Sequence, residues 1–195
     1  MRLLETPHGQ ARVHLREVDT ARAALVLGHG AGGGVESPDL QGAANAALEA
    51  RLTVALVEQP YRVAGRRAPA PAAQLDAAWV SVVSQLPFEG LALIAGGRSS
   101  GARVACRTAA EVGASAVLCL AFPVHPPGRP EKSRLDELDA VEVPTLVIQG
   151  ERDPFGLPPP GPLRTVVTVA GTHSLRSSGT IAAAVSDWLT NLQVA

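Results

Sequence analysis

The stretch that decides the fold is Leu91-Ala92-Leu93-Ile94-Ala95-Gly96-Gly97-Arg98-Ser99-Ser100-Gly101, an apolar run that ends in a Gly-x-Ser-x-Gly pattern. The apolar run predicts a buried strand, and residues 102–110 after it read as a helix. A serine at such a junction is typical of a nucleophile elbow, whereas the alternative is a glycine-rich turn without chemistry. Glycines are favoured on both sides because the serine takes a strained backbone and its neighbours crowd other segments. We therefore take Ser99 as the candidate nucleophile and the Ser100 N–H as a candidate oxyanion donor.

Composition narrows the class of protein. The chain has 195 residues, 46% of them hydrophobic but only 3% aromatic, so its core must consist mainly of Ala, Val and Leu. We expect a single domain over residues 1–195. The net charge of −1 gives no reason to expect nucleic acid or a membrane as a partner. Because neither a signal peptide nor an apolar run of ~20 residues is recognisable, we expect a cytoplasmic protein. The cysteines, Cys106 and Cys119, are expected to be reduced and structural.

The order of elements predicts the fold class. The front end reads as an antiparallel hairpin, residues 2–6 and 10–18, with turn residues at 7–9. Short apolar runs then alternate with helical patterns. One predicted helix has Ser37 as its N-cap and Pro38 as its first residue. This alternation predicts an α/β fold, a mostly parallel, doubly wound sheet with helices on both faces. The candidate strands are Ala23–Gly28, Val54–Glu58, Leu91–Ala95, Ala116–Ala121, Thr145–Gln149 and Arg164–Val169, and the candidate helix faces lie at residues 40–48, 75–86 and 181–192.

An acid and a histidine follow two of the later strands. Asp153 comes after the run 145–149, and His173 comes after the run 165–169. In an open parallel sheet, functional residues gather beyond the carboxyl ends of the strands. A serine needs a base within hydrogen-bond reach and an acid to orient that base. The order Ser99, Asp153, His173 along the chain is the one expected of a hydrolase triad on such a sheet.

Other residues compete for these roles. Glu151 follows the same predicted strand as Asp153, and Asp136 and Glu137 lie in the loop region before that strand. We prefer Asp153 because the Gly-x-x-Asp-Pro pattern places it clear of the strand. Ser100 is the rival nucleophile, but only Ser99 has glycine at both the second residue before and the second residue after it.

The glycine-rich segment 28–34 allows two interpretations. As a loop after an early strand, it would supply a second oxyanion donor, for which we choose the Ala31 N–H, with Gly32 as its neighbour. His29 then reads as a loop-anchoring residue rather than a base. The same segment also satisfies Gly-x-Gly-x-x-Gly, with Glu58 ending the following strand as a ribose-binding acid would. The capping signal at Ser37 argues against this dinucleotide site, because a loop separates the glycines from the helix N-terminus.

The segments His29-Gly30-Ala31-Gly32 and Gly97-Arg98-Ser99-Ser100-Gly101, taken with Asp153 and His173, resemble the α/β-hydrolase superfamily over essentially the whole chain. A narrower resemblance rests on the motifs His29-Gly30-Ala31-Gly32, Glu58-Gln59-Pro60-Tyr61-Arg62, Gly96-Gly97-Arg98-Ser99-Ser100-Gly101 and Phe122-Pro123-Val124-His125-Pro126-Pro127-Gly128. On these motifs the sequence looks most like small, lid-poor members related to testis-expressed and KAN L-type hydrolase-like proteins and to bacterial dienelactone-hydrolase-like enzymes. The resemblance implies an α/β-hydrolase fold with a minimal cap and a serine-hydrolase mechanism. Dienelactone hydrolases proper carry cysteine at the elbow, so Ser99 makes that activity doubtful.

These observations predict a serine hydrolase of the carboxylesterase type acting on a small-molecule acyl substrate, an ester before a thioester or amide. No metal or organic cofactor is implied. The alternatives are a hydrolase fold used as an interaction module and, less favoured, a dinucleotide-binding protein. Arg62 and Arg98 allow two interpretations. They could bind a carboxylate of the substrate, or they could form ion pairs with Glu58 or another acid. The candidate substrate pocket comprises His29, Gly32, Arg62, Arg98 and His125.

Overall fold

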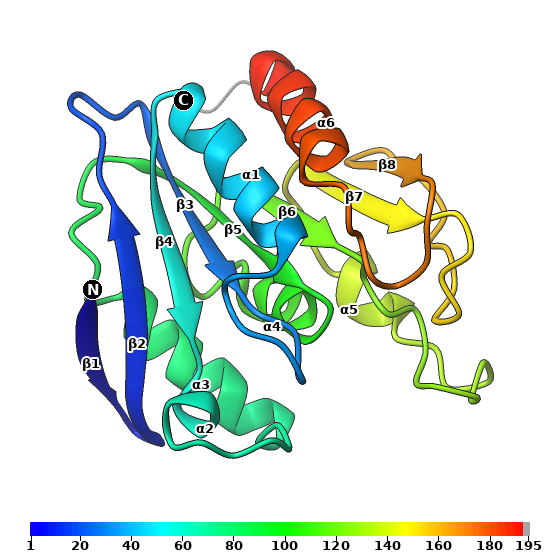
Figure 1. The fold of residues 1–195 in the computed structure, drawn as a ribbon, viewed down its shortest axis with the longest axis horizontal. Coiled ribbons are helices and arrows are strands. Elements are labelled where there is room, and N and C mark those ends of the chain that lie inside the picture. Colours follow the sequence, from blue (N-terminus) through cyan, green and yellow to red (C-terminus); the bar gives the residue numbers. More distant parts are fainter. Residues whose placement is uncertain (193–195) are drawn as a thin grey trace.

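One twisted sheet of eight strands runs through the molecule, and helices cover both of its faces (Figure 1). The computed structural model describes residues 1–192. The strands, in spatial order β1-β2-β4-β3-β5-β6-β7-β8, are β1 (Arg2–Thr6), β2 (Gly9–Arg16), β4 (Leu52–Glu58), β3 (Ala23–Gly28), β5 (Ala92–Arg98), β6 (Ala116–Leu120), β7 (Thr145–Gly150) and β8 (Arg164–Val169). The helices are α1 (Pro38–Glu49), α2 (Pro60–Val63), α3 (Ala72–Val83), α4 (Ser100–Thr108), α5 (Leu135–Asp139) and α6 (Ser178–Asn191).

The sheet has the predicted mixture of pairings. The β1–β2 hairpin is antiparallel and joins the rest of the sheet through an antiparallel pairing of β2 with β4. All pairings from β4 to β8 are parallel, and these strands are mostly buried, as expected for a sheet covered on both faces. The predicted fold class, a mostly parallel doubly wound sheet with an N-terminal hairpin, is confirmed.

Two apolar layers sandwich the sheet. On one face, α3 and α4 contribute Trp79 and Val104 to a core cluster, and on the other α1 and α6 contribute Leu40 and Ile181. Figure 1 shows α1 and α6 side by side on this second face. Trp79 is fully buried in the first cluster, whereas Trp188 packs against the second. Cys106 and Cys119 are buried and form no disulfide, and their sulfur atoms lie 3.5 Å apart, within hydrogen-bond distance.

The carboxyl ends of the parallel strands meet along one edge of the sheet, where the loops that carry the predicted site residues begin. The strand ends are Gly28 of β3, Arg98 of β5, Gly150 of β7 and Val169 of β8. The connection from β6 to β7 holds only the five-residue helix α5. This edge therefore carries the minimal cap that was expected.

No helix within residues 1–192 is long and apolar enough to cross a membrane.

Three local expectations need correction. β5 continues through Gly96 and Gly97 to Arg98 instead of ending at Ala95, since both glycines pair with β6. The short helix α2 was not predicted. Ser37 precedes α1 as expected, but its hydroxyl makes no capping bond, and the Leu40 N–H is bound by the adjacent Asp39 carboxylate instead.

Candidate active site

The turn between β5 and α4 holds Ser99 in a strained conformation. Its φ of 52° and ψ of −107° lie where residues with a Cβ are rare. The Ser99 N–H donates to the Leu120 carbonyl at the end of β6, 2.9 Å away, which fixes the turn against the neighbouring strand. A Cβ on Gly97 would lie 2.6 Å from the Gly28 oxygen, and one on Gly101 would collide with the same oxygen. The close approach predicted for the flanking glycines is therefore present.

His173 bridges the other two predicted residues. Its Nε2 lies 2.8 Å from Ser99 Oγ, and its Nδ1 lies 2.9 Å from Asp153 Oδ2. The Asp153 side chain is 1% exposed and the His173 side chain 17%. An ionised carboxylate can only accept, so this geometry places the proton of a neutral imidazole on Nδ1 and leaves the Nε2 lone pair facing the serine hydroxyl.

The rival residues lie elsewhere. Glu151 and Asp136 are exposed, and Glu137 forms ion pairs with Arg103 and Arg107. Of the two adjacent serines, it is Ser99 whose hydroxyl meets the histidine.

Gln149, which the sequence analysis did not single out, lies behind Asp153. Its side chain is fully buried at the end of β7, and its Nε2 lies 2.8 Å from Asp153 Oδ2. The same nitrogen lies 3.0 Å from the Phe122 carbonyl and 2.9 Å from the Gly156 carbonyl. The Phe155 N–H donates to Asp153 Oδ1 at 2.9 Å, so both carboxylate oxygens are held. The available signal was a polar residue closing an otherwise apolar strand.

The aromatic ring of Phe155 completes the support of the histidine. Its centroid lies 4.2 Å from that of the His173 ring, with the two planes tilted by 49°. The short loop after β7 thus supplies Asp153, a backbone donor to its carboxylate, and an apolar ring against the imidazole. Packing of this kind limits the orientations open to the His173 ring.

The glycine-rich loop after β3 reaches the same place. A Cβ on Gly30 would lie 3.6 Å from Ser99 Cβ, so the loop backbone borders the serine. The loop is closed by the Gly33 N–H, which donates to the Gly30 carbonyl at 3.2 Å. Tyr61 Oη donates to the Ala31 carbonyl at 2.8 Å and ties the loop to α2. Burial raises the pKa of this phenol to about 12.

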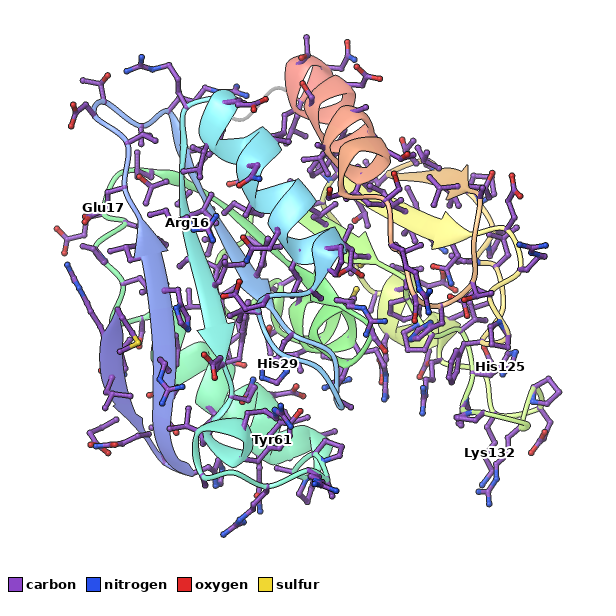
Figure 2. The ribbon with its side chains drawn as sticks, viewed as in Figure 1. Arg16, Glu17, His29, Tyr61, His125 and Lys132 are labelled. Carbon is purple, nitrogen blue, oxygen red and sulfur yellow. The ribbon has the colours of Figure 1, made fainter. Side chains whose placement is uncertain are left out.

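His29 anchors the glycine-rich loop after β3 through hydrogen bonds, in line with the loop-anchoring interpretation. It is 2% exposed, and its ring lies edge-on to the ring of Tyr61, with the ring centroids 5.8 Å apart (both residues are labelled in Figure 2). The Gln59 N–H donates to His29 Nε2 at 3.1 Å, which leaves the proton on Nδ1 to bind the Gly30 carbonyl at 2.8 Å. Burial lowers the pKa of this imidazole and keeps it neutral.

Gly32, Arg98 and Arg176 line a groove of about 510 Å³, whose lining includes the chain neighbours of Ser99 and His173 but neither of those two residues. Arg98 is engaged within the protein. Its Nε lies 2.8 Å from the buried Asp39 carboxylate, and its Nη2 donates to the His173 carbonyl at 3.2 Å. Its partner is therefore Asp39, the structural alternative weighed above.

His29 and the two remaining candidate pocket residues, His125 and Arg62, are not among the residues that line this groove. His125, labelled in Figure 2, binds the adjacent Pro126 carbonyl through Nδ1 at 2.9 Å, and a Cβ on Gly156 would lie 3.3 Å from its ring. Arg62 is half-buried on α2, and within residues 1–192 its guanidinium has no ion-pair partner. Neither side chain is hydrogen-bonded to the Ser99–His173–Asp153 group in this part of the chain.

The features required for a dinucleotide site are not assembled. α1 begins at Pro38, beyond the glycine loop, so its N-terminus does not adjoin Gly33. Glu58, the candidate ribose ligand, is bound by Arg12 at 3.2 Å and by His14 at 2.6 Å.

Comparison with known proteins identifies the family. A family described as "Alpha/beta hydrolase domain" matches residues 21–177. The chain belongs to the alpha/beta hydrolase family. No curated protein sequence matches it significantly.

Solved structures of other alpha/beta hydrolases share the fold. An alpha-beta serine hydrolase homologue from Coxiella burnetii superposes with a TM-score of 0.75 at 15% identity, over 96% of both chains. A lidless a/b serine hydrolase from Xanthomonas campestris gives 0.73 at 21% identity, over 100% of this chain and 95% of the other. A dienelactone hydrolase from Anabaena variabilis gives 0.73 at 18% identity, over 97% and 95%.

Proposed function

We propose that this alpha/beta hydrolase is a serine hydrolase that cleaves small carboxylic esters through Ser99, His173 and Asp153. The observation that carries the proposal is the unbroken hydrogen-bond chain from Ser99 Oγ to His173 Nε2 and from His173 Nδ1 to Asp153 Oδ2. A serine hydroxyl is a weak nucleophile at neutral pH, so it needs a base with a free lone pair pointing at it. The neutral tautomer of His173 fixed by Asp153 provides one.

In this mechanism Ser99 Oγ attacks the ester carbonyl carbon while His173 takes its proton. The imidazolium that forms is stabilised by the buried Asp153 carboxylate. The proton then passes to the leaving alkoxide, the C–O bond breaks, and an acyl-Ser99 ester remains. Water, deprotonated by His173, attacks the acyl carbon, the bond between that carbon and Ser99 Oγ breaks, and His173 returns the proton to Ser99 Oγ as the acid leaves.

The negative charge of the tetrahedral intermediate needs two hydrogen-bond donors. We assign the N–H groups of Ser100 and Ala31 to this role. Ser100 is the first residue of α4, so its N–H belongs to the first turn, which has no intrahelical acceptor. Ala31 follows Gly30, whose Cα faces Ser99. The Tyr61 hydroxyl fixes Ala31 by donating a hydrogen bond to its own carbonyl. Backbone donors held in this way lose no free energy to reorganisation during the reaction.

Small esters are the substrates that the surroundings favour. The β6–β7 connection contributes only α5, so no large cap covers the serine, and the groove beside it is open. An ester also needs less leaving-group assistance than an amide. Thioesters are the second most favoured substrates. We therefore propose that the enzyme is a carboxylesterase.

Labelling with a fluorophosphonate probe tests the proposal, because the probe forms a covalent bond only with an activated serine. The wild-type protein and the Ser100→Ala variant should label, whereas Ser99→Ala should not. Hydrolysis of p-nitrophenyl acetate and butyrate should follow the same pattern and fall with longer acyl chains. Wild-type protein that is folded yet neither labels nor hydrolyses either ester at neutral to mildly alkaline pH would exclude the mechanism.

A further inference from the structure

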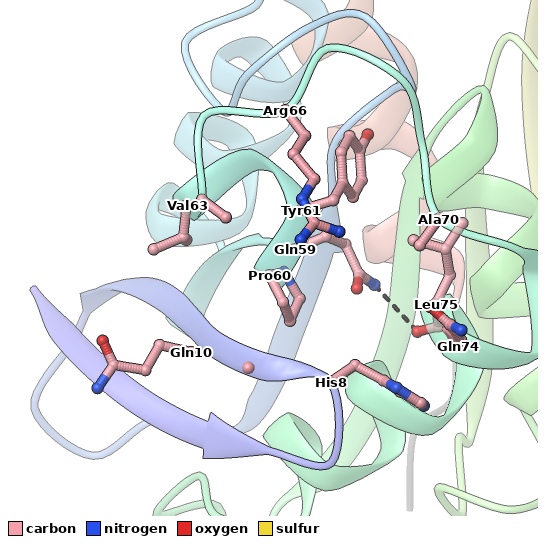
Figure 3. A pocket seen from close by; sticks show the side chains of 12 residues that line it. His8, Gln10, Gln59, Pro60, Tyr61, Val63, Arg66, Ala70, Gln74 and Leu75 are labelled. Atoms are coloured by element: carbon pink, nitrogen blue, oxygen red, sulfur yellow. Dashed lines mark hydrogen bonds between the residues drawn. The ribbon is translucent and has the colours of Figure 1, made fainter.

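A second cavity, of about 410 Å³, lies between the β1–β2 turn, α2 and the start of α3 (Figure 3). We call it the α2 cavity. Its volume is in the range of small-molecule sites. Ser99, Asp153, His173 and the proposed oxyanion donors are not among its lining residues, so it is distinct from the site described above. The residues that matter here are His8, Gln59, Pro60, Tyr61, Arg66 and Leu75.

The wall of the α2 cavity holds a buried acceptor without a donor. Gln59 is 6% exposed, and its Nε2 donates to the Leu75 carbonyl at 3.1 Å. Its Oε1 is also buried, and no group within residues 1–192 donates to it. A buried carbonyl oxygen in this state lacks the hydrogen bond that most such groups have. Because this oxygen is itself inaccessible, the Gln59 side chain must shift for the N–H or O–H group of a ligand to supply that hydrogen bond.

The mouth of the α2 cavity carries uncompensated positive charge. The Arg66 guanidinium points back toward Gln59 and Pro60, as Figure 3 shows, and forms no ion pair within the described chain. None of the described lining residues is acidic. The acid that precedes α2, Glu58, is already bound by Arg12 and His14. A planar guanidinium in this setting favours a carboxylate, which it can bind through two parallel hydrogen bonds.

The rest of the lining is mixed. Pro60, Tyr61, Val63, Ala70 and Leu75 contribute apolar surface, whereas His8, Gln10 and Gln74 are polar. A ligand that satisfies only Arg66 and Gln59 would leave this surface in contact with water. An apolar body of a few carbon atoms would cover it.

We propose that the α2 cavity binds a small organic carboxylate that has an apolar body and one N–H or O–H donor. The carboxylate binds Arg66, the donor binds Gln59 Oε1, and the apolar body lies on Pro60 and Leu75. N-acyl amino acids and branched 2-hydroxy acids have this combination. Binding does not depend on the proposed hydrolase activity.

Calorimetric titration with N-acetylleucine and with 2-hydroxy-4-methylpentanoate tests the proposal, on the wild-type protein and on Ser99→Ala. Both proteins should bind at least one of these acids with equal affinity, which separates this result from any outcome at the serine. Two analogues of N-acetylleucine examine the contacts: its primary amide lacks the carboxylate, and its N-methyl derivative lacks the N–H donor. Each should bind about fivefold more weakly, the effect of one net hydrogen bond or exposed ion pair.

Matched variants locate the site. Arg66→Gln should weaken N-acetylleucine about fivefold and make the acid and its primary amide bind alike. The control Arg67→Gln removes the same charge one residue away, outside the cavity lining, and should change affinity little. Gln59→Leu should abolish the difference in affinity between N-acetylleucine and its N-methyl derivative. If Gln59→Leu fails to fold, the comparison of Arg66→Gln with Arg67→Gln still tests the site. The proposal is overturned if neither acid binds at millimolar concentration, if Arg66→Gln and Arg67→Gln act alike, or if Arg176→Gln in the groove near Ser99 abolishes binding instead.

Discussion

Gln149 holds Asp153 from behind, its Nε2 lying 2.8 Å from the carboxylate oxygen that also faces His173. The glutamine is fully buried, and the same nitrogen reaches the Phe122 and Gly156 carbonyls. It therefore fixes the carboxylate relative to two segments, the end of β6 and the loop after β7. The orientation of the imidazole depends on this residue even though Gln149 does not touch the serine.

Replacing Gln149 with leucine should lower kcat for p-nitrophenyl acetate about tenfold to a hundredfold, because the acid loses a fixed partner and the histidine loses alignment. KM should change much less, since Gln149 lies away from the substrate groove. The control Gln85→Leu alters an exposed glutamine after α3 and should leave both constants unchanged. An unchanged kcat in a folded Gln149→Leu protein would contradict a positioning role.

Replacing Asp153 with asparagine should lower kcat/KM by about three to four orders of magnitude, because the amide stabilises the wrong imidazole tautomer. Glu151→Gln removes the same charge at the same strand end from an exposed position, and should stay within about twofold of wild type. Steady-state ester hydrolysis measures both. If the two variants lose activity equally, Asp153 is not the orienting acid.

Two glycines at the same position in their helices should respond in opposite ways to alanine. Gly101 is the second residue of α4, and a Cβ there collides with the Gly28 carbonyl, so Gly101→Ala should cost about 1–3 kcal/mol of unfolding free energy. Gly179 is the second residue of α6 with no atom near its Cβ position, so Gly179→Ala should be neutral or stabilising by up to about 1 kcal/mol. Urea unfolding compares them, and equal effects would argue against the close approach at the elbow.

The buried His29 should make stability depend on pH. Burial lowers its pKa in the folded protein from 6.5, so below that pH the unfolded chain binds more protons than the folded one. The His29 contribution is therefore complete above about pH 6.5 and is lost as the pH falls toward the lowered pKa.

A His29→Gln variant, which can accept from Gln59 and donate to Gly30 without titrating, should show a flatter dependence of Tm on pH between 8 and 5. His8→Gln, at an exposed histidine, is the control and should keep the wild-type slope. Parallel pH profiles for wild type and His29→Gln would show that His29 is not the group responsible.

The sequence predicts the elbow and its two partners because each follows an apolar strand, and strand ends of a parallel sheet converge. It does not predict Gln149, whose role depends on Phe122 and Gly156 coming together around it. The Arg98–Asp39 pair is not predictable from the sequence either, because Asp39 lies in the first turn of α1 and not at the end of a strand. Ser37 shows a different limit: its position marks the helix start correctly, but the first-turn carboxylate of Asp39 takes the bond expected of its hydroxyl.

The sheet also separates the two tryptophans of the chain, which places one fluorophore in each apolar layer. Trp79 lies beneath the end of β3, where a Cβ on Gly28 would be 3.2 Å from its ring, and Trp188 packs on the opposite layer. Single replacements by phenylalanine would leave one emitter at a time. The loss of order under the glycine-rich loop and the detachment of α6 can then be timed independently in the same protein, without any attached dye.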